Sequence, residues 1–464
     1  MMNGNAHEDA KHALKGSLRI AVTGGSGQLG TLLLRRLASD RAVQSIVSLD
    51  LRPPAVASAK LTAITADVRD PDLERHFVGC DAVVHLAFIV TAFASREQMQ
   101  AINVEGSKNV FRAAAAAGAA HIVYTSSVAA YGIVPGHPVP IVEDTPRRHQ
   151  PGFNYSANKF EVEAFLDEFE PAHPTVPICR IRPVILVGDR MDHSLGDAVR
   201  RGRMPDSGGP PLPFVWDEDV ADFVVLALKQ RAHGAYNLVA DDPISTDEFA
   251  AGAGLEPLRI PRKLAVRVAR VSPWLAKAGL LRAVDPAWVD HDAGPIVVSS
   301  AKARALGWRP RFPTTTDVAR RLGQTPRAVD RRIALFMRMA AYSAPRMPVM
   351  PEAQRVNALV HVELTGRSGG DYTIEIENGK PSIRPGVARP PTSVVTLRAS
   401  TFLDLLSGKL SMATAQLTGK IRLEGEPVAT MILSALATAF RVQREQPGAR
   451  GWPARRLTQW FEAP

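Results

Sequence analysis

The fold of this chain is decided by residues 19–37, RIAVTGGSGQLGTLLLRRL. An apolar run ending at Val22 leads into a turn that contains Gly24, Gly27 and Gly30, and leucines at helical spacing follow. A strand, a glycine turn and a helix in this order bring unpaired backbone N–H groups and the positive end of the helix dipole to a bound pyrophosphate. The segment therefore predicts a dinucleotide-binding unit, whereas three glycines alone would be equally typical of a tight turn with close helix packing.

An acidic residue at the end of the second apolar run supports this prediction. Asp50 follows Gly30 by twenty residues, where a carboxylate can accept hydrogen bonds from the adenosine ribose. The same charge would repel a ribose 2′-phosphate, which favours NAD over NADP, although Arg52 offsets part of that repulsion. Asp67 ends the third run, and its carboxylate suits either the adenine amino group or a helix cap.

Apolar, β-branched runs alternate with helical stretches through the first half of the chain. Continuous apolar strands separated by helices predict a parallel sheet covered on both faces, which is a doubly wound α/β domain. The expected strands are residues 18–22, 45–49, 61–65, 82–86, 121–125 and 176–181.

Composition limits the class of protein and its partners. The 464 residues suffice for two or three domains, and 45% hydrophobic with 22% charged residues is typical of a globular protein. The polar start, residues 1–16, lacks a signal-peptide core and no apolar run is long enough to cross a bilayer, so we expect a cytoplasmic location. Cys80 and Cys179 lack metal-ligand spacing, so neither a disulfide nor a metal is expected.

The formal net charge of +10 favours anionic partners such as acyl-CoA, a nucleotide cofactor or acidic lipid headgroups. It does not choose among them. The arginines are not interleaved with base-stacking aromatic residues in a zinc-finger or RNA-binding motif, so we expect no nucleic-acid partner.

The pattern changes after a proline-rich stretch between about residues 309 and 352. Val360, Val362 and Leu364 alternate with polar residues, as do Tyr372, Ile374 and Ile376, which predicts half-buried antiparallel strands. Asn378 and Gly379 supply a hairpin turn because both tolerate positive φ. With helices expected at residues 401–406 and 427–439, this part is predicted to be an α+β domain.

The candidate catalytic residues begin with a tyrosine and a lysine. Tyr155 and Lys159 are four residues apart, so they share one face of a helix. A nearby ammonium stabilises a phenolate and lowers the phenol pKa, which would let Tyr155 exchange a proton with a substrate hydroxyl or carbonyl. Ser127 follows the strand at 121–125, at the sheet edge where ligands bind, and its hydroxyl can hydrogen-bond the reacting oxygen.

Ordered motifs across residues 17–325 resemble the extended short-chain dehydrogenase family, also described as the NAD-dependent epimerase/dehydratase family. The matching segments are residues 23–30, Asp67, 103–106, 125–127, 131–132, 155–159, 182–183 and 306–310. The resemblance implies a Rossmann-type sheet with a small substrate lobe. It also implies that Ser127 polarises the substrate oxygen, Tyr155 is the acid/base, Lys159 tunes it and binds the nicotinamide ribose, and Asn103 positions the lysine. The implied cofactor contacts are Gly24, Gly27, Gln28, Leu29, Gly30, Asp50, Asp67, Val68, Leu86, Ala87, Tyr155, Lys159 and Pro183.

One departure from the family narrows the chemistry. Sugar-nucleotide dehydratases carry an Asp-Glu pair directly after the position of Ser127, because eliminating water needs its own acid and base. Val128 and Ala129 stand there in this chain, which disfavours dehydration. Oxidation or reduction, or epimerisation through a keto intermediate, remains.

Residues 352–445 resemble a sterol carrier protein-2 domain, on the segments 364–366, 369–372, 378–380, 405–410 and 416–421. The resemblance implies a lipid- or sterol-binding module, while a filled core that binds nothing stays open. Residues 326–351 are expected to form a linker with an amphipathic helix that packs between the domains or touches an anionic membrane surface. Residues 446–464 are expected to be a partly docked tail.

The two resemblances together suggest an NAD-dependent dehydrogenase of a sterol, steroid or other hydrophobic substrate, comparable in type to 3β-hydroxysteroid dehydrogenases. Two alternatives remain open at this point: a nucleotide-sugar epimerase or reductase, and a non-enzymatic lipid carrier or NAD-responsive protein. The family resemblance also implies a homodimer formed through a helix bundle.

Overall fold

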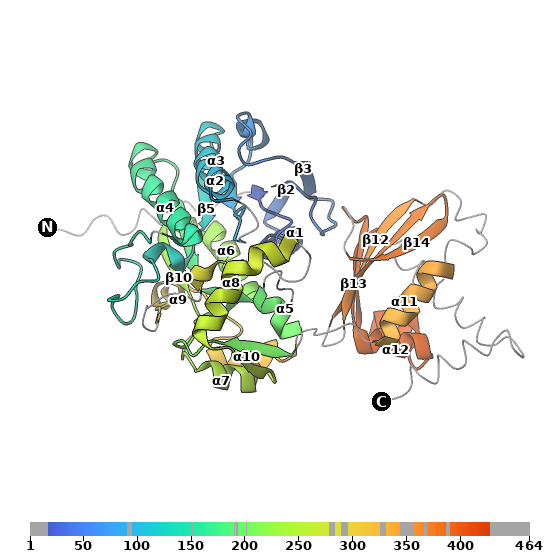
Figure 1. Ribbon diagram of the computed structural model, residues 1–464. Helices are drawn as coiled ribbons and strands as arrows, with labels where there is room; N and C mark the ends of the chain where they lie inside the picture. Colours follow the sequence, from blue (N-terminus) through green and yellow to red (C-terminus); the bar gives the residue numbers. More distant parts are fainter. Residues whose placement is uncertain are drawn as a thin grey trace, which may run out of the picture. The chain divides into compact units, whose positions relative to one another are not determined.

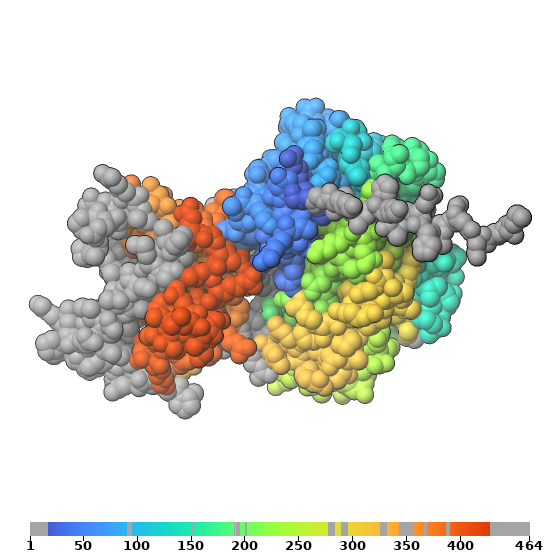
Figure 2. Space-filling model, turned by 180° about the vertical axis from the view of Figure 1, so that it is seen from behind, coloured from blue at the N-terminus to red at the C-terminus, as the bar shows by residue number. Residues whose placement is uncertain are grey.

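The computed structural model describes residues 17–90, 95–150, 152–189, 191, 194–200, 202–277, 284–288, 296–324, 331–343, 357–365, 369–386 and 390–426, and the other residues are drawn in grey (Figure 1, Figure 2). The chain divides into two units. The first comprises Met1–Pro54 and Lys60–Gly323, and the second Ala55–Ala59 and Gln324–Pro464.

The first unit is built on a seven-stranded parallel sheet. Its spatial order is β10-β6-β5-β4-β1-β2-β3, in which the order reverses between β1 and β4 and creates a crevice at the carboxyl ends of the strands. All six strands predicted from the sequence are confirmed, and β10 adds a seventh. The strands are β1 (Leu18–Thr23), β2 (Val43–Asp50), β3 (Leu61–Thr65), β4 (Ala82–His85), β5 (His121–Thr125), β6 (Ile178–Pro183) and β10 (Gly234–Leu238).

Helices cover the sheet because each has one apolar side. On α1 (Gln28–Ser39), Leu33, Leu34 and Leu37 are buried, and this helix contacts α6 (Asp217–Gln230). A separate core joins the sheet to α3 (Gly106–Ala116) and α4 (Asn154–Ala172), with Phe111 and Leu166 fully buried in it. The shorter elements are η2 (Leu73–His76), α2 (Arg96–Gln100), the π-helix η3 (Ala101–Glu105) and η4 (Val128–Tyr131).

A lobe with its own core follows the sixth strand. Two small parallel sheets pair β7 (Ile185–Val187) with β9 (Phe214–Trp216), and β8 (Arg203–Asp206) with β11 (Glu256–Arg259). Trp308 is buried and its indole donates to the Asp219 carbonyl of α6, which fixes the late segment to the main body. The other elements are α5 (Ser194–Arg200), α7 (Thr246–Gly252), α8 (Arg262–Lys277), η5 (Pro286–Trp288), α9 (Ala301–Ala305) and α10 (Thr315–Leu322).

The second unit contains a five-stranded mixed sheet in the order β14-β13-β12-β15-β16. The predicted hairpin is present: Asn378 (φ 51°) and Gly379 (φ 74°) connect β13 to β14. The predicted helix at 401–406 is α12, and that at 427–439 lies outside the described residues. The elements are β12 (Ala358–Thr365), β13 (Gly370–Glu377), β14 (Lys380–Pro385), β15 (Ser393–Arg398), α12 (Ala399–Ser407), α13 (Met412–Leu417) and β16 (Ile421–Gly425).

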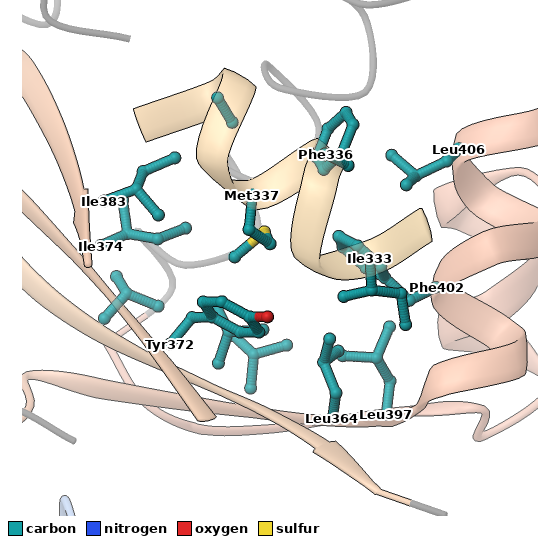
Figure 3. Packing of buried hydrophobic residues seen from close by; sticks show 14 of the residues in the cluster. Ile333, Phe336, Met337, Leu364, Tyr372, Ile374, Ile383, Leu397, Phe402 and Leu406 are labelled. Carbon is teal, nitrogen blue, oxygen red and sulfur yellow. The ribbon is translucent and has the colours of Figure 1, made fainter. Parts of the chain in front are cut away.

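Helix α11 (Arg331–Ser343) belongs to the core of the second unit, which corrects its assignment to a linker. Ile333, Phe336 and Met337 point into the apolar cluster beneath the helix, facing Tyr372 and Phe402 (Figure 3). The rings of Phe336 and Phe402 meet edge to face at 5.8 Å. The helix packs here because its apolar side needs a partner surface, which the apolar face of the sheet provides.

The polar face of β12 is also covered, which differs from the expected half-buried strand. His361 is 1% exposed and Glu363 is 7% exposed. Each has a polar partner across the sheet: His361 Nε2 lies 2.9 Å from Asp371 Oδ1, and the Thr396 hydroxyl donates to Glu363 at 3.1 Å. Such partners are what allow polar side chains to be buried.

Candidate active site

The glycine turn after β1 approaches its neighbours too closely for side chains. Gly24 has φ +76°, and a Cβ on it would lie 2.6 Å from the Ala87 nitrogen, in the loop after β4. A Cβ on Gly30 would lie 2.2 Å from the Gly24 carbonyl oxygen. The turn, the first turn of α1 and the Leu86–Ala87 loop are therefore held together, and Leu86 N donates to Thr23 O at 3.1 Å.

The start of α1 suits an anion. Gly27 is the N-cap residue and provides no side-chain cap, and the first turn, with Gln28 and Leu29, contains no acidic residue. Backbone N–H groups and the helix dipole at this end can therefore serve a pyrophosphate. The predicted glycine residues fit a dinucleotide in this structure.

Asp50 lies at the end of β2 beside that turn. One carboxylate oxygen accepts from Ser26 N at 3.0 Å and the other from Arg52 N at 3.1 Å. A carboxylate oxygen can accept more than one hydrogen bond, so this fixed orientation leaves capacity for ribose hydroxyls.

Asp67 and Val68 follow β3. The Asp67 carboxylate accepts two hydrogen bonds from the Arg69 guanidinium, at 3.0 and 2.6 Å, and these hold its pKa below the usual value. Val68 packs against Gly106, where a Cβ would lie 2.6 Å from a Val68 methyl group. Asp67 is therefore an ion-paired turn residue in this structure, and an adenine contact stays a prediction.

The catalytic candidates meet at the carboxyl edge of β5. Ser127 ends the segment after β5, and its Oγ accepts from Ala129 N at 3.1 Å and lies 3.4 Å from the Pro183 carbonyl of β6. Tyr155 is in the first turn of α4. Burial raises the pKa of the Tyr155 phenol, and a hydrogen bond with the Ser127 side chain acts in the opposite direction. Ser127 and Tyr155 therefore lie next to each other, and the net shift of the phenol pKa is upward, whereas the sequence suggested a downward shift.

Lys159 lies one helical turn after Tyr155 and is 2% exposed. Its ammonium donates to Thr125 O at 2.8 Å and lies 3.4 Å from the Phe88 ring centroid and 5.9 Å from the Tyr155 ring centroid. Burial holds the pKa of this ammonium well below its usual range, while the negative charge of Glu163 acts to raise it.

Glu163 was not predicted from the sequence. It lies one turn beyond Lys159 on α4 and is fully buried. It accepts from Ser126 Oγ at 2.5 Å and from Arg182 Nε at 2.9 Å, and the Arg182 guanidinium in turn donates to the Tyr131 hydroxyl at 2.7 Å. Tyr131 and Arg182, which belong to the family motifs, therefore hold Glu163 in place one turn beyond Lys159. The four-residue spacing of Tyr155, Lys159 and Glu163, which places them on one helix face, is the sequence signal that could have identified Glu163.

A second buried network links the glycine turn to Asn103. His85 Nδ1 lies 2.7 Å from Thr23 Oγ1, and its Nε2 lies 2.8 Å from Ser107 Oγ, which donates to the Asn103 carbonyl at 2.5 Å. Burial lowers the pKa of His85 to about 3, so the imidazole is neutral. The Asn103 side chain pairs with both backbone groups of Ile89, at 2.7 and 3.0 Å, so these contacts position that loop rather than the lysine.

Aromatic residues surround the Tyr155 ring. Phe88 meets it edge to face with centroids 5.7 Å apart, and the ring centroid of Trp288, in η5, also lies 5.7 Å away. Phe153 packs on Trp288 at 4.8 Å. This set, Phe88, Phe153 and Trp288, is called the aromatic wall below. It makes the surroundings of the phenol apolar.

Asp217 is a further buried acid near the glycine turn that the sequence did not reveal. It is the first residue of α6, and its carboxylate accepts from Gln28 Nε2 at 2.7 Å. Burial raises its pKa to about 7.

Two other predictions concern thiols and metals. Cys80 and Cys179 are free and buried, and burial raises the pKa of both thiols. Within the described ranges, no group of three or more His, Cys, Asp or Glu residues could hold a metal ion.

Comparison with known families agrees with both resemblances. Residues 20–238 match the NAD dependent epimerase/dehydratase family. Residues 346–438 match the SCP-2 sterol transfer family. Among the helices of the part of the chain described, none is long and apolar enough to cross a membrane.

Individual proteins similar to this chain include two curated relatives. A 3-beta-hydroxysteroid dehydrogenase of Mycolicibacterium neoaurum is 26% identical over 363 residues, which is 71% of this chain and 97% of the relative. An N-acetyl-alpha-D-glucosaminyl-diphospho-ditrans,octacis-undecaprenol 4-epimerase of Escherichia coli O157:H7 is 28% identical over 242 residues, which is 50% of this chain and 70% of the relative. The structure of a UDP-glucose 4-epimerase of Thermus thermophilus in complex with NAD aligns with a TM-score of 0.51 at 23% identity, covers 66% of this chain and 99% of that chain, and shares its fold.

Proposed function

We propose that this protein is an NAD-dependent dehydrogenase of a hydrophobic alcohol or ketone, such as a sterol or steroid. The premise is that residues 20–238 belong to the NAD-dependent epimerase/dehydratase family and residues 346–438 to the SCP-2 sterol transfer family. The observation that carries the proposal is the position of Tyr155. Tyr155 lies beside Ser127, whose side chain acts to lower the phenol pKa, and one helical turn before Lys159. Phe88 and Trp288 of the aromatic wall pack against its ring.

In the proposed oxidation, the Tyr155 oxygen takes the proton of the substrate hydroxyl while Ser127 hydrogen-bonds the same oxygen. Bound NAD would be held at the glycine turn and the start of α1, with Gly24, Gly27 and Gly30, and would supply the hydride acceptor. The Lys159 charge stabilises the phenolate that the step requires, and Glu163 raises the pKa of that ammonium against the effect of burial. The reverse sequence reduces a ketone.

The aromatic wall favours an apolar substrate. Phe88 and Trp288 present ring surface to the phenol, and buried apolar area binds hydrocarbon better than it binds hydroxyl-rich sugars. The names of the two curated relatives contain a hydroxysteroid and an undecaprenol-linked sugar, both of which have a large hydrocarbon part. The SCP-2 family match supports a lipid-binding module in the same chain.

Epimerisation of a nucleotide sugar is the second candidate, supported by the fold shared with UDP-sugar epimerases. Dehydration is disfavoured by η4, where Val128, Ala129 and Ala130 supply no acid or base beside Ser127. The NAD preference rests on Asp50, whose oriented carboxylate would repel a 2′-phosphate.

The test is turnover by the purified full-length protein. We expect NADH formation from a 3β-hydroxysteroid and none from UDP-glucose or UDP-N-acetylglucosamine, with slower reaction when NADP replaces NAD. Tyr155→Phe should lower kcat by about 100- to 10,000-fold, because it removes only the proton-exchanging oxygen. Tyr236→Phe is the matched control, since it removes a phenol on β10 and should leave kcat unchanged. UDP-sugar epimerisation without steroid oxidation would establish the second candidate instead.

A further inference from the structure

Helix α8 (Arg262–Lys277) exposes large apolar residues on the side that does not pack. Leu264, Val268, Val271 and Trp274 are 51%, 41%, 51% and 72% exposed, whereas the other side is buried through Val266, Ala269 and Ser272. At about 100° per residue, Leu264, Val268 and Val271 form one stripe and Trp274 stands beside it. Four of the fourteen exposed large hydrophobic residues in the described part of the chain lie on this one helix.

The same helix is strongly cationic. Its sequence has five basic residues and no acidic one: Arg262, Lys263, Arg267, Arg270 and Lys277. Lys263, Arg267 and Arg270 are exposed and border the apolar stripe on the side of Trp274. An exposed stripe flanked by cations is complementary to an anionic lipid surface, where apolar side chains enter the headgroup boundary and the cations meet the headgroups. An exposed tryptophan suits this boundary because its ring system is apolar while its indole N–H is polar.

The helix is also joined to the candidate active site. The Ser272 hydroxyl donates to the Ala269 carbonyl at 2.8 Å and accepts from Val284 N at 2.8 Å, so it ties α8 to the segment that leads into η5. Helix α8 contacts η5, and Trp288 of η5 belongs to the aromatic wall around Tyr155. The element that exposes the stripe thus also supports the wall.

The sequence had pointed to the helix near residue 333 as the candidate for membrane contact. In the structure, Ile333, Phe336 and Met337 of α11 are committed to the core of the second unit. This helix still exposes Leu335, Met339 and Tyr342, at 40%, 41% and 69%, with the exposed Arg338 beside them, whereas α8 has a row of three exposed cations, Lys263, Arg267 and Arg270. Helix α11 therefore serves as the comparison for α8 in the vesicle-binding test.

We propose that α8 docks the protein on an anionic lipid surface, with Leu264, Val268, Val271 and Trp274 in the headgroup boundary and Lys263 and Arg267 at the headgroups. Docking itself does not depend on the enzymatic activity. The consequence that a hydrophobic substrate reaches Tyr155 from the lipid, past Trp288, rests on the proposed dehydrogenase function.

The test is sedimentation of the full-length protein with vesicles of phosphatidylcholine alone and of phosphatidylcholine mixed with phosphatidylserine. We expect binding to the mixed vesicles that weakens as salt is added. Lys263→Gln with Arg267→Gln should weaken binding about 30-fold, from about 1 kcal/mol for each basic residue. Val268→Ser with Trp274→Ser should weaken it at least about tenfold per residue.

Leu335→Ser with Met339→Ser on α11 is the matched control and should bind as the unchanged protein does. Absence of wild-type binding, or unchanged binding by both α8 variants, would overturn the proposal. So would sedimentation velocity showing that the α8 variants convert a dimer into a monomer, since the occupant of the stripe would then be a second copy. The Tyr155→Phe variant should bind vesicles as the unchanged protein does. If the unchanged protein binds vesicles but does not oxidise a steroid, only the proposed activity is refuted. If it oxidises a steroid but does not bind vesicles, only the proposed docking is refuted.

Discussion

The buried carboxyl of Asp217 should make the first unit less stable as the pH rises, and replacing it should reverse this. Asp217 is 3% exposed, and its pKa rises from 3.8 to about 7, first because of burial and then because of the nearby acidic Glu218 and Asp189. The hydrogen bond from Gln28 acts in the opposite direction. The carboxyl lies close to Gly188, where a Cβ would be 2.0 Å from Asp217 Oδ2, so a bulkier residue would not fit.

The sign and size of this effect on the free energy of unfolding follow from the linkage between protonation and folding. An acid whose pKa is higher in the folded than in the unfolded protein opposes folding only in its ionised form, so the effect starts above pH 3.8 and is complete above about 7. A shift of about three units, at about 1.4 kcal/mol each, gives a loss of about 4 kcal/mol at alkaline pH. Asp217→Asn keeps the shape and can still accept from Gln28, so we expect a gain of up to about 4 kcal/mol near pH 8 and almost none near pH 4.

The assay is guanidinium unfolding of both proteins at the two pH values, followed by tryptophan fluorescence. Trp216 and Trp308 are buried in the first unit and report its unfolding. Asp40→Asn is the control of opposite sign. Burial acts to raise the Asp40 pKa, but the hydrogen bonds from Lys229 and from Ala42 N lower it overall, so its loss should destabilise more near pH 8 than near pH 4. Equal stability changes for Asp217→Asn at the two pH values, or a destabilisation near pH 8, would refute the reasoning.

Three further outcomes are expected. Gly30→Ala should abolish NAD binding in a fluorescence titration, because the new methyl group would lie 2.2 Å from the Gly24 carbonyl; unchanged affinity would show that the turn does not hold the cofactor. Glu163→Gln leaves the buried Arg182 guanidinium without its charge partner and should cost about 3 to 5 kcal/mol of unfolding free energy, whereas a loss near zero would mean that the pair contributes little. Phe336→Ala should destabilise the second unit by about 3 to 5 kcal/mol in calorimetry, and an unaffected transition of that unit would contradict the core placement of α11.

The strands and the glycine turn could be predicted because their signals are local. The six predicted strands of the first sheet each contain an apolar or β-branched run, whereas β10, with the sequence GAYNL, does not and was not predicted. Gly24, Gly30 and Asp50 are spaced by the geometry of one βαβ unit. The pair formed by Tyr155 and Lys159 is likewise visible within one helical turn. These features need no information about distant parts of the chain.

The supporting contacts could not be predicted because they join residues far apart in sequence. Gln28 meets Asp217 across 189 positions, and Tyr131 meets Asn237 across 106. No short pattern encodes such pairs. The upward shift of the Tyr155 pKa has the same origin, since it depends on how completely other segments bury the phenol. Helix α11 shows a further limit: its amphipathic pattern predicts a helix but not which surface will cover its apolar side.

The enclosure of Lys159 has a practical consequence. Its ammonium is 2% exposed, capped by the Thr125 carbonyl and covered by the Phe88 ring, while lysines such as Lys229, with half of its side chain exposed, stand in solvent. Amine-reactive reagents must reach the nitrogen, so burial protects Lys159 even though its lowered pKa favours the free amine, and the outer lysines react first. The protein can therefore be attached to a solid support through its amines while the one that the proposed chemistry needs stays unmodified.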